Sequence, residues 1–295
     1  MSKIIRYITA ISLAALSFCS CQEEYITYND AEYIMFADTL ASYPVQKDVE
    51  FFTVPVVSTT VCDYDRTFGV EVIDKESNAI ESLHYRLESN TLTIKAGETR
   101  ADVKVYGIYD NIEASDQLGF TLQLVMPDQL EMGMYGKRTK VMLVKSCPFD
   151  VNNFTGWVKM TSSFWLQYSS SLHFERIVKS EPVEGEPNTF VIKDFLMDGY
   201  DVKFRVDDTD ILNPVIEMVG EQIVGDTRIP FQMVYGDGRI RGFEDPSYLP
   251  YFDICNRYAE TYMYMYVKNV GTIGTFVNII EWITDEEANE YLSEL

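Results

Sequence analysis

Aromatic and acidic side chains gather in one stretch of the sequence, residues 243–253, which holds four aromatic and three acidic residues. Aromatic faces stack on the apolar faces of sugar rings or on peptide side chains, and neighbouring carboxylates accept hydrogen bonds from hydroxyl or amide groups. The stretch therefore predicts a binding loop for a glycan or a peptide. We expect the contacts to come from Tyr248, Tyr251 and Phe252.

A second aromatic set follows at alternate positions, Tyr262, Tyr264 and Tyr266. Successive side chains of a strand point to opposite faces, so the three tyrosines share one face and the intervening methionines the other. We expect the methionine face to be core. The tyrosine face is either a surface for a ligand or partner, or it packs across strands beneath the 243–253 loop.

Residues for catalysis are scarce. The chain has two histidines, His84 and His173, and no GxSxG, HExxH or P-loop motif. The glycine-rich segment 236–238 is typical of a hairpin turn. Among 46 acidic residues many carboxylate pairs are possible, but without geometry none can be assigned to glycoside cleavage. The sequence therefore favours a protein that is not an enzyme and that needs no cofactor.

The cysteines limit metal and disulfide chemistry. Beyond the N-terminal segment the chain has Cys62, Cys147 and Cys255, with no CxxC motif and no Cys/His cluster. This pattern excludes a zinc knuckle and permits at most one disulfide. Ordinary buried thiols are the simpler expectation.

The N-terminus has the pattern of a secretion signal. Lys3 and Arg6 lie at the start of an apolar run that ends at Phe18, and the small residue Ser20 precedes Cys21. The run is shorter than the ~20 apolar residues that span a bilayer. A basic head, a short apolar core and small residues before a break predict a cleaved signal peptide over residues 1–20.

Ser20 and Cys21 resemble the cleavage site of bacterial lipoprotein signals, in which the new N-terminal cysteine is acylated, for example with palmitate. Cys21 fits better than Cys19, because bulky Phe18 would occupy the cleavage position before Cys19. The residues Gln22–Glu24 also resemble the acidic surface-export tag of Bacteroidetes lipoproteins. The resemblance implies a lipid anchor in the outer membrane and a protein that faces the cell exterior; the alternative is a plain signal peptide with an incidental cysteine.

Charge restricts the class of partner. Removal of residues 1–20 leaves 275 residues, a natural length for two domains, with 22 basic residues against 46 acidic ones and a net charge near −24. A surface this acidic repels phosphate backbones, so nucleic-acid binding is excluded.

After a polar tether over residues 21–30, residues 31–146 show short alternating segments divided by turn residues and no helical periodicity. Many short strands at near-regular spacing predict an immunoglobulin-like β-sandwich. Pro55 predicts an edge strand or a bulge, because proline lacks a backbone donor. The expected strands are 33–36, 50–57, 68–72, 83–87, 92–94, 103–108, 120–124 and 140–144.

Parts of this domain resemble the Calx-beta pattern, in which a strand ending in a Gly-Glu turn precedes a strand that runs into an acidic loop. The resemblance is carried by residues 65–68, 83–85, 92–98 and 108–113. It implies a Calx-beta-like sandwich and possible calcium ligands at the loop positions Asp110, Glu113 and Asp116. Three acids on one loop do not supply the six to eight oxygens of a calcium site, so solvated loop acids are the alternative.

Pro148 ends the last strand of the first domain, and residues 147–295 predict a second antiparallel β domain, either a lipocalin-like barrel or a sandwich. A capping box at Thr284–Glu287 predicts a C-terminal helix, whose apolar stripe should lie against the β domain. The expected strands are 157–161, 164–171, 189–192, 202–206, 215–219, 229–235 and 262–267.

Both domains resemble a Bacteroidetes lipoprotein family of unknown function found beside SusC/SusD-like nutrient importers. The resemblance implies an accessory or ligand-binding component of an outer-membrane glycan or peptide uptake system. A calcium-stiffened adhesive or structural surface module is the alternative hypothesis.

Overall fold

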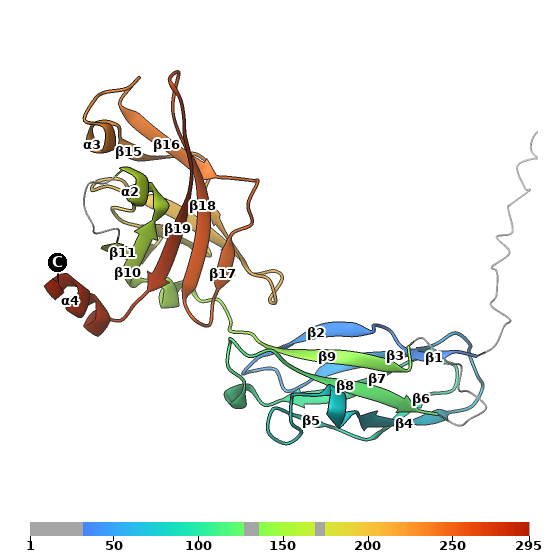
Figure 1. The fold of residues 1–295 in the computed structure, drawn as a ribbon. Helices are drawn as coiled ribbons and strands as arrows, with labels where there is room; N and C mark the ends of the chain where they lie inside the picture. Colours follow the sequence, from blue (N-terminus) through green and yellow to red (C-terminus); the bar gives the residue numbers. More distant parts are fainter. Residues whose placement is uncertain (1–31, 127–135, 169–174, 295) are drawn as a thin grey trace, which may run out of the picture.

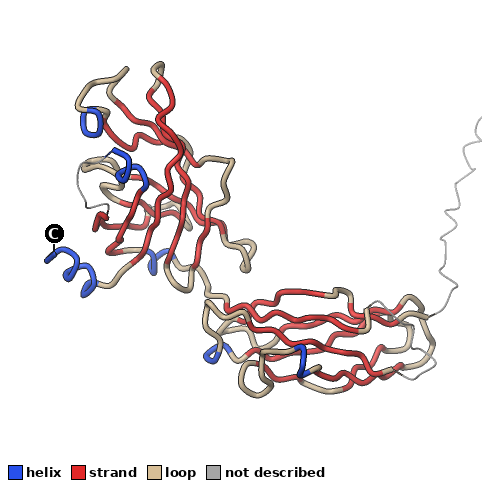
Figure 2. The backbone as a smooth tube through the Cα atoms, in the orientation of Figure 1, coloured by secondary structure: helices blue, strands red, loops and turns tan. Residues whose placement is uncertain are grey.

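A computed structural model describes residues 32–126, 136–168 and 175–294. Figure 1 shows two β domains that meet end to end through a short connection. Most of the regular structure is strand (Figure 2), so the predicted all-β fold with a short C-terminal helix is confirmed. No helix of the described residues is long and apolar enough to cross a membrane.

The first domain is a sandwich of two sheets. One has the order β1-β3-β7-β5 and the other β2-β9-β8-β4-β6; every pairing is antiparallel except β2 with β9, which is parallel. Its strands are β1 Ile34–Phe36, β2 Leu40–Val45, β3 Phe52–Ser58, β4 Arg66–Val72, β5 Tyr85–Leu87, β6 Thr91–Ile94, β7 Arg100–Gly107, β8 Leu118–Val125 and β9 Arg138–Lys145. Two short 3-10 turns, η1 Asp74–Glu76 and η2 Tyr109–Asn111, lie between strands.

The inward residues of both sheets form one apolar core. At its centre the rings of Tyr85 and Phe120 are stacked, with centroids 3.8 Å apart and planes 7° from parallel. Burial raises the pKa of the Tyr85 hydroxyl. The alternation of apolar and polar residues along β4, β7 and β8 therefore places the apolar side chains in the core, as predicted, because one face of each sheet is covered by the other sheet.

The prediction of an edge strand or bulge at Pro55 is wrong. β3 lies between β1 and β7, and its register runs unbroken through the pair Pro55 and Asp102. The Pro55 carbonyl accepts a hydrogen bond from Ala37, just beyond the last residue of β1, Phe36. Because N and C=O of one strand residue point to the same side, the missing donor of Pro55 also faces this position past the end of β1. The short partner strand is what lets proline lie in an inner strand.

The second domain is one strongly curled sheet of ten strands, in the order β14-β13-β12-β11-β10-β19-β18-β16-β15, with β17 paired to β18. Gln222, in the last strand of this order, reaches the second strand: its amide accepts from the Lys203 backbone N–H and donates to the Lys203 carbonyl, each at 2.9 Å. The strands are β10 Gly156–Ser162, β11 Glu175–Pro182, β12 Thr189–Ile192, β13 Val202–Asp207, β14 Val215–Met218, β15 Gln222–Asp226, β16 Arg239–Glu244, β17 Tyr251–Asp253, β18 Tyr258–Val267 and β19 Gly271–Trp282.

The curled sheet encloses an aromatic core around Trp282. The indole N–H donates to the Phe154 carbonyl at 2.9 Å and to Ser180 Oγ at 3.0 Å, so the polar group of this buried ring has partners. Phe154 ends the 3-10 turn η4 Val151–Phe154, which enters the domain. A single curled sheet around one core corresponds to the barrel-like alternative and not to a second sandwich.

Two segments predicted as strands contain helix instead. The prediction of a strand over 164–171 is wrong for residues 164–168, because α2 Ser163–Tyr168 is a helix whose start is stabilised by Ser162 Oγ, which accepts from the Phe164 N–H at 3.3 Å. Residues 169–171 lie outside the described residues. The prediction of a strand over 229–235 is also wrong, because residues 229–231 belong to the single turn α3 Arg228–Phe231 and residues 232–235 form no strand. Asp226 accepts from the Arg228 N–H at 2.8 Å, so local hydrogen bonds outweigh the β preference of the apolar residues that follow.

The C-terminal helix α4 Asp285–Glu294 starts with the expected capping box. The Glu287 carboxylate accepts from the Thr284 N–H at 2.7 Å, and the Glu287 N–H donates to Thr284 Oγ1 at 3.2 Å. The predicted apolar stripe is only partly used, because Ala288 is buried while Leu292 is exposed. Lys159 of β10 lies 4.9 Å from the ring centroid of Tyr291, so the helix packs on the outside of the sheet.

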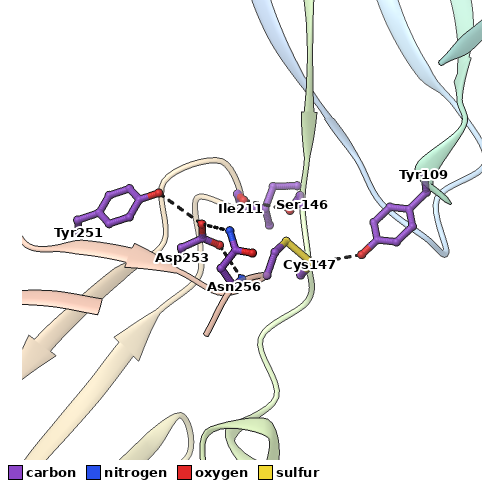
Figure 3. Close-up of a disulfide and its surroundings, with 8 residues drawn as sticks. Tyr109, Ser146, Cys147, Ile211, Tyr251, Asp253 and Asn256 are labelled. Carbon is purple, nitrogen blue, oxygen red and sulfur yellow. Dashed lines mark hydrogen bonds between the residues drawn. A yellow bond between two sulfur atoms is a disulfide. The ribbon is translucent and has the colours of Figure 1, made fainter. Parts of the chain in front are cut away.

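Cys147 and Cys255 form a disulfide, with Cα atoms 5.3 Å apart, and Cys62 is a free thiol. The expectation of ordinary buried thiols is therefore wrong for two of the three cysteines. They are 108 residues apart in the chain, so only the fold brings them together. Figure 3 shows the bond beside the connection between the two domains.

Candidate ligand-binding surface

Strand β18 presents its tyrosines on the outer face of the curled sheet. Met263, Met265 and Val267 are buried in the core, whereas Tyr262, Tyr264 and Tyr266 are half-buried on the opposite face. The two-residue period of the strand is therefore confirmed. On the neighbouring strand β19, Tyr262 pairs with Val277 and Tyr264 pairs with Thr275. These partner side chains are small, so they leave the tyrosine rings accessible from one side.

The loop that follows β16 places a further ring over this face. Tyr248 stacks on Tyr262 with ring centroids 4.8 Å apart and planes 10° from parallel. Asp245 fixes the loop, because its N–H donates to the Tyr262 carbonyl at 2.7 Å and its carboxylate accepts from Thr275 Oγ1 at 2.5 Å and from the Ser247 N–H at 3.0 Å. These hydrogen bonds lower the pKa of Asp245. Tyr248 is thus held in place by its own loop.

Rings continue along the surface in both directions. On one side Phe243 lies 5.0 Å from Tyr264, and Tyr264 lies 6.3 Å from Tyr266. On the other side Tyr251 of β17 lies 6.1 Å from Tyr258 at the start of β18. We call this set the tyrosine strip. It consists of Phe243, Tyr248, Tyr251, Tyr258, Tyr262, Tyr264 and Tyr266.

The exposed part of the tyrosine strip is the loop and its edge strand. Tyr248 is 49% exposed, Tyr251 55% and the intervening Leu249 90%. At the far end a shallow, open hollow is lined by Phe243, Tyr264, Tyr266, Val270 and Thr272. The β18 tyrosines pack against rings of the neighbouring strand and of the loop, as one of the two alternatives expects. Contact of the β18 tyrosines with a ligand stays a prediction.

Phe252 does not belong to the surface. Its neighbours in β17 point outward, and strand alternation turns Phe252 inward, where it is 5% exposed. Its ring packs 5.2 Å from Phe154 and 6.3 Å from Trp282. The prediction of Phe252 as a ligand contact is therefore wrong, since a three-residue strand gives too little sequence to set the direction of its side chains.

Carboxylates accept hydrogen bonds from the hydroxyls of the strip. Tyr262 donates to Glu260 and Tyr266 donates to Glu221, and these bonds raise the pKa of both hydroxyls. Tyr264 shares a hydrogen bond with Thr272. The hydroxyls of Tyr262, Tyr264 and Tyr266 are thereby engaged within the protein, so these three residues can offer a ligand chiefly their ring faces.

Glu244, the residue before Asp245, is a partly buried acid of this region. Its carboxylate accepts from the Tyr262 N–H at 3.2 Å, in the gap between the β16 and β17 pairings with β18. Burial raises the pKa of Glu244, and the hydrogen bond opposes the rise. The Glu244 carboxylate thus serves as the acceptor for the Tyr262 N–H at a position where the neighbouring strands offer no backbone carbonyl.

The prediction missed two members of the strip, and only one of them has a signal in the sequence. Tyr258 lies on the same face as Tyr262 if the two-residue period is continued backward through Glu260. Phe243 lies opposite Tyr264 in the β16–β18 ladder, and that contact depends on strand register. Register between distant strands has no local sequence signal, so only the first residue was within reach of the sequence.

The predicted calcium ligands are not brought together. Asp110, Glu113 and Asp116 are exposed, and Asp116 accepts from the Glu113 N–H at 2.8 Å, which makes it a turn residue. Within the described part of the chain no three His, Cys, Asp or Glu side chains are placed to hold a metal ion. The predicted lipid-attachment residue Cys21 and the tag residues Gln22, Glu23 and Glu24 lie outside the described residues.

Comparison with protein-family models gives one match, described as "Domain of unknown function (DUF4984)", over residues 134–294. This range covers more than half of the chain and includes β9 and the whole described second domain. A comparison with curated proteins found no match.

Several solved structures are similar to the chain. The apo Calx CBD1 domain is 15% identical and covers 40% of this chain and 100% of its own, with a TM-score of 0.33. A protein of unknown function from Bacteroides ovatus is 12% identical, covering 84% of this chain and 90% of its own, with a TM-score of 0.36. An auxiliary nutrient binding protein from Bacteroides thetaiotaomicron is 12% identical, covering 88% and 94%, with a TM-score of 0.32. At TM-scores below 0.5 these likenesses carry no functional argument.

Proposed function

Since the chain belongs to the DUF4984 family, whose function is unknown, we propose a function from its own surface. The protein is a non-enzymatic lipoprotein, anchored through Cys21 in the outer membrane and facing the cell exterior. Its tyrosine strip contacts a glycan or a peptide, and the protein acts as an accessory component of an uptake system.

One observation carries the binding role: the exposed rings of Tyr248 and Tyr251 with Leu249 between them. Large apolar side chains exposed together on a folded surface cost hydration free energy, and such surfaces are typical of interaction sites. Aromatic faces suit the C–H-bearing faces of sugar rings and peptide side chains. The hydrogen bonds of Asp245 hold the loop in one conformation, so a ligand would not have to order it.

The charge of the strip selects among ligands. Glu221, Asp253 and Glu260 lie along it, and the whole chain has a formal net charge of −22. Carboxylates accept hydrogen bonds from hydroxyl and amide donors but repel sulfates, phosphates and uronates. The strip is therefore suited to neutral glycans and to neutral or basic peptides, and unsuited to polyanions.

A binding panel tests this function. The purified mature protein is titrated with neutral oligosaccharides, uronate-containing oligosaccharides and peptides, and the tightest ligand is then titrated into Y248A and Y251A. Loss of one stacked ring should raise Kd about tenfold, since an aromatic contact of this kind contributes ~1.4 kcal/mol. Tyr64→Ala is the matched control, because Tyr64 is similarly exposed but lies in the first domain. Unchanged affinity in both strip variants would refute the assignment.

The uptake role needs a partner at the membrane. The resemblance to importer-associated lipoproteins supports a SusC/SusD-like pair as that partner. Mild detergent extraction and affinity purification of the acylated protein should co-purify such a pair. Recovery of the lipoprotein alone, with the importer pair intact in the same extract, would remove the importer from the proposal and leave the ligand-binding role to the panel above.

A further inference from the structure

The connection between the two domains is short and is held from both sides. β9 ends at Lys145 and η4 begins at Val151, so only residues 146–150 join the domains. From the first domain, the Val45 carbonyl accepts from the Ser146 N–H at 3.0 Å. From the second domain, the Ile211 carbonyl accepts from the Ser146 hydroxyl at 3.1 Å. One residue is therefore hydrogen-bonded to both domains.

The next residue is covalently bound to the second domain. Cys147 is bonded to Cys255 in the turn between β17 and β18, and its sulfur also lies 3.2 Å from the Tyr109 hydroxyl of the first domain (Figure 3). The Lys145 ammonium at the end of β9 is 4.4 Å from the ring centroid of Tyr109, so this tyrosine contacts both the last residue of β9 and Cys147 in the connection. Two residues after Cys147, the ring of Phe149 packs on the ring of Phe154 in the core of the second domain, with centroids 5.0 Å apart.

Apart from these contacts the two domains are only loosely packed. Between them lies a cleft of roughly 140 Å³, lined on one side by Ala114 and Val144 and on the other by Ile211, Pro214 and Tyr251. A cleft between domain surfaces means that apolar packing does not fill the junction there. Domains joined by small interfaces move relative to each other unless something else restrains them.

We propose that the Cys147–Cys255 disulfide is an interdomain clamp. It fastens the connection to the second domain at the residue where the chain leaves the first domain, and so fixes one orientation of the two domains. The same bond holds the Asp253–Asn256 turn, in which Asp253 accepts from the Asn256 N–H at 2.9 Å. The clamp therefore also sets the direction in which Tyr251 and the tyrosine strip face relative to the first domain.

The test measures the distance between the domains in the full mature chain. Spin labels are attached to p-acetylphenylalanine at Lys75 and Glu184, two exposed positions in different domains, because thiol labels would react with cysteine. Double electron–electron resonance then compares wild type, C147S/C255S and the control Cys62→Ser, which alters only the free cysteine. We expect one narrow distribution in wild type and the control, and a distribution at least about twice as wide in C147S/C255S.

Reduction of the folded wild type gives a second arm that does not depend on folding of the variant. A small dithiol passes two electrons and two protons to the two sulfurs and closes into its own disulfide, which leaves two cysteine thiols to be alkylated. The distribution should widen as in C147S/C255S. Equal widths before and after reduction, with near-ultraviolet circular dichroism unchanged, would overturn the clamp. Ligand binding is not part of either measurement, so this result is independent of the proposed function.

Discussion

Two stacked tyrosines, one in each domain, have similar geometry and opposite surroundings. Tyr85 lies on Phe120 in the sandwich with centroids 3.8 Å apart and is 1% exposed, whereas Tyr248 lies on Tyr262 at 4.8 Å and is 49% exposed. The first stack is enclosed by both sheets and so contributes to folding. The second keeps one open ring face. Burial, and not ring geometry, separates an aromatic pair that stabilises the fold from one that is available to a ligand.

The largest expected effect is on the buried stack. Tyr85→Ala removes a fully enclosed ring and leaves a cavity over Phe120, so we expect the free energy of unfolding of the first domain to fall by about 3–5 kcal/mol. Urea denaturation followed by circular dichroism measures it. A loss below that of Tyr248→Ala would show that the distinction between the two stacks is mistaken.

Next in size is the covalent link. C147S/C255S should lower the stability of the second domain by about 2–4 kcal/mol, because the bond closes a long loop in the unfolded chain. Thermal unfolding of the double variant beside Cys62→Ser measures the difference. Equal midpoints in the two proteins would mean that the bond restrains the domain orientation without stabilising the domain.

The exposed stack should contribute little to folding. Tyr248→Ala is expected to lower the free energy of unfolding by less than about 1 kcal/mol, since the ring is half in solvent and its loss opens no cavity. The same urea series measures this value. A loss comparable to that of Tyr85→Ala would assign the ring to the structure of the loop, and the binding role would then need other residues.

The smallest effect concerns pH. Burial raises the pKa of Glu244 above the ordinary glutamate value of 4.5, so the folded state holds this proton more tightly than the unfolded state. The stability that this group contributes is complete below pH 4.5 and is lost as the pH rises through the folded pKa. Glu244→Gln keeps the acceptor for the Tyr262 N–H and should flatten the fall in stability above that pH.

Chemical denaturation at a series of pH values measures the slope for wild type and Glu244→Gln. Glu287→Gln is the matched control, because hydrogen bonds from Thr284 lower the pKa of Glu287 and give the opposite sign. Its stabilising contribution is present above the unfolded pKa and is lost as the pH falls through the folded pKa. Parallel slopes for wild type and Glu244→Gln would contradict the assignment.

Local patterns predicted more of this molecule than contacts between distant segments. The alternation in β18 and the capping box at Thr284 each depend only on residues close together in the sequence, and the structure has both. Cys147 and Cys255 meet only because the β17–β18 turn folds against the domain connection. No spacing in the sequence contains that information, because the sulfurs belong to segments 108 residues apart.

The errors at the site have the same origin. Phe252 lies in the loop-like stretch that predicts ligand contacts, yet its strand pairs with β18 and turns the ring into the core. Residues 164–168 have the aromatic content of a strand, but Ser162 starts a helix there. β19, the longest strand among the described residues, has glycines and an asparagine in its sequence and therefore lacks a clear strand signal. For Phe252 and β19, pairing with a distant strand decided what composition left open, whereas for residues 164–168 a local hydrogen bond did.

The central claim, that the outer ring faces of the tyrosine strip contact the ligand, is tested most directly by hydroxyl-radical footprinting with mass spectrometry. In the free protein the peptide that contains Tyr248, Leu249 and Tyr251 should be oxidised rapidly, as should Tyr64 in the first domain. With the tightest ligand of the panel at saturation, oxidation of the 248–251 segment should fall several-fold while Tyr64 is unchanged. Protection elsewhere with undiminished oxidation of residues 248–251 would contradict the account.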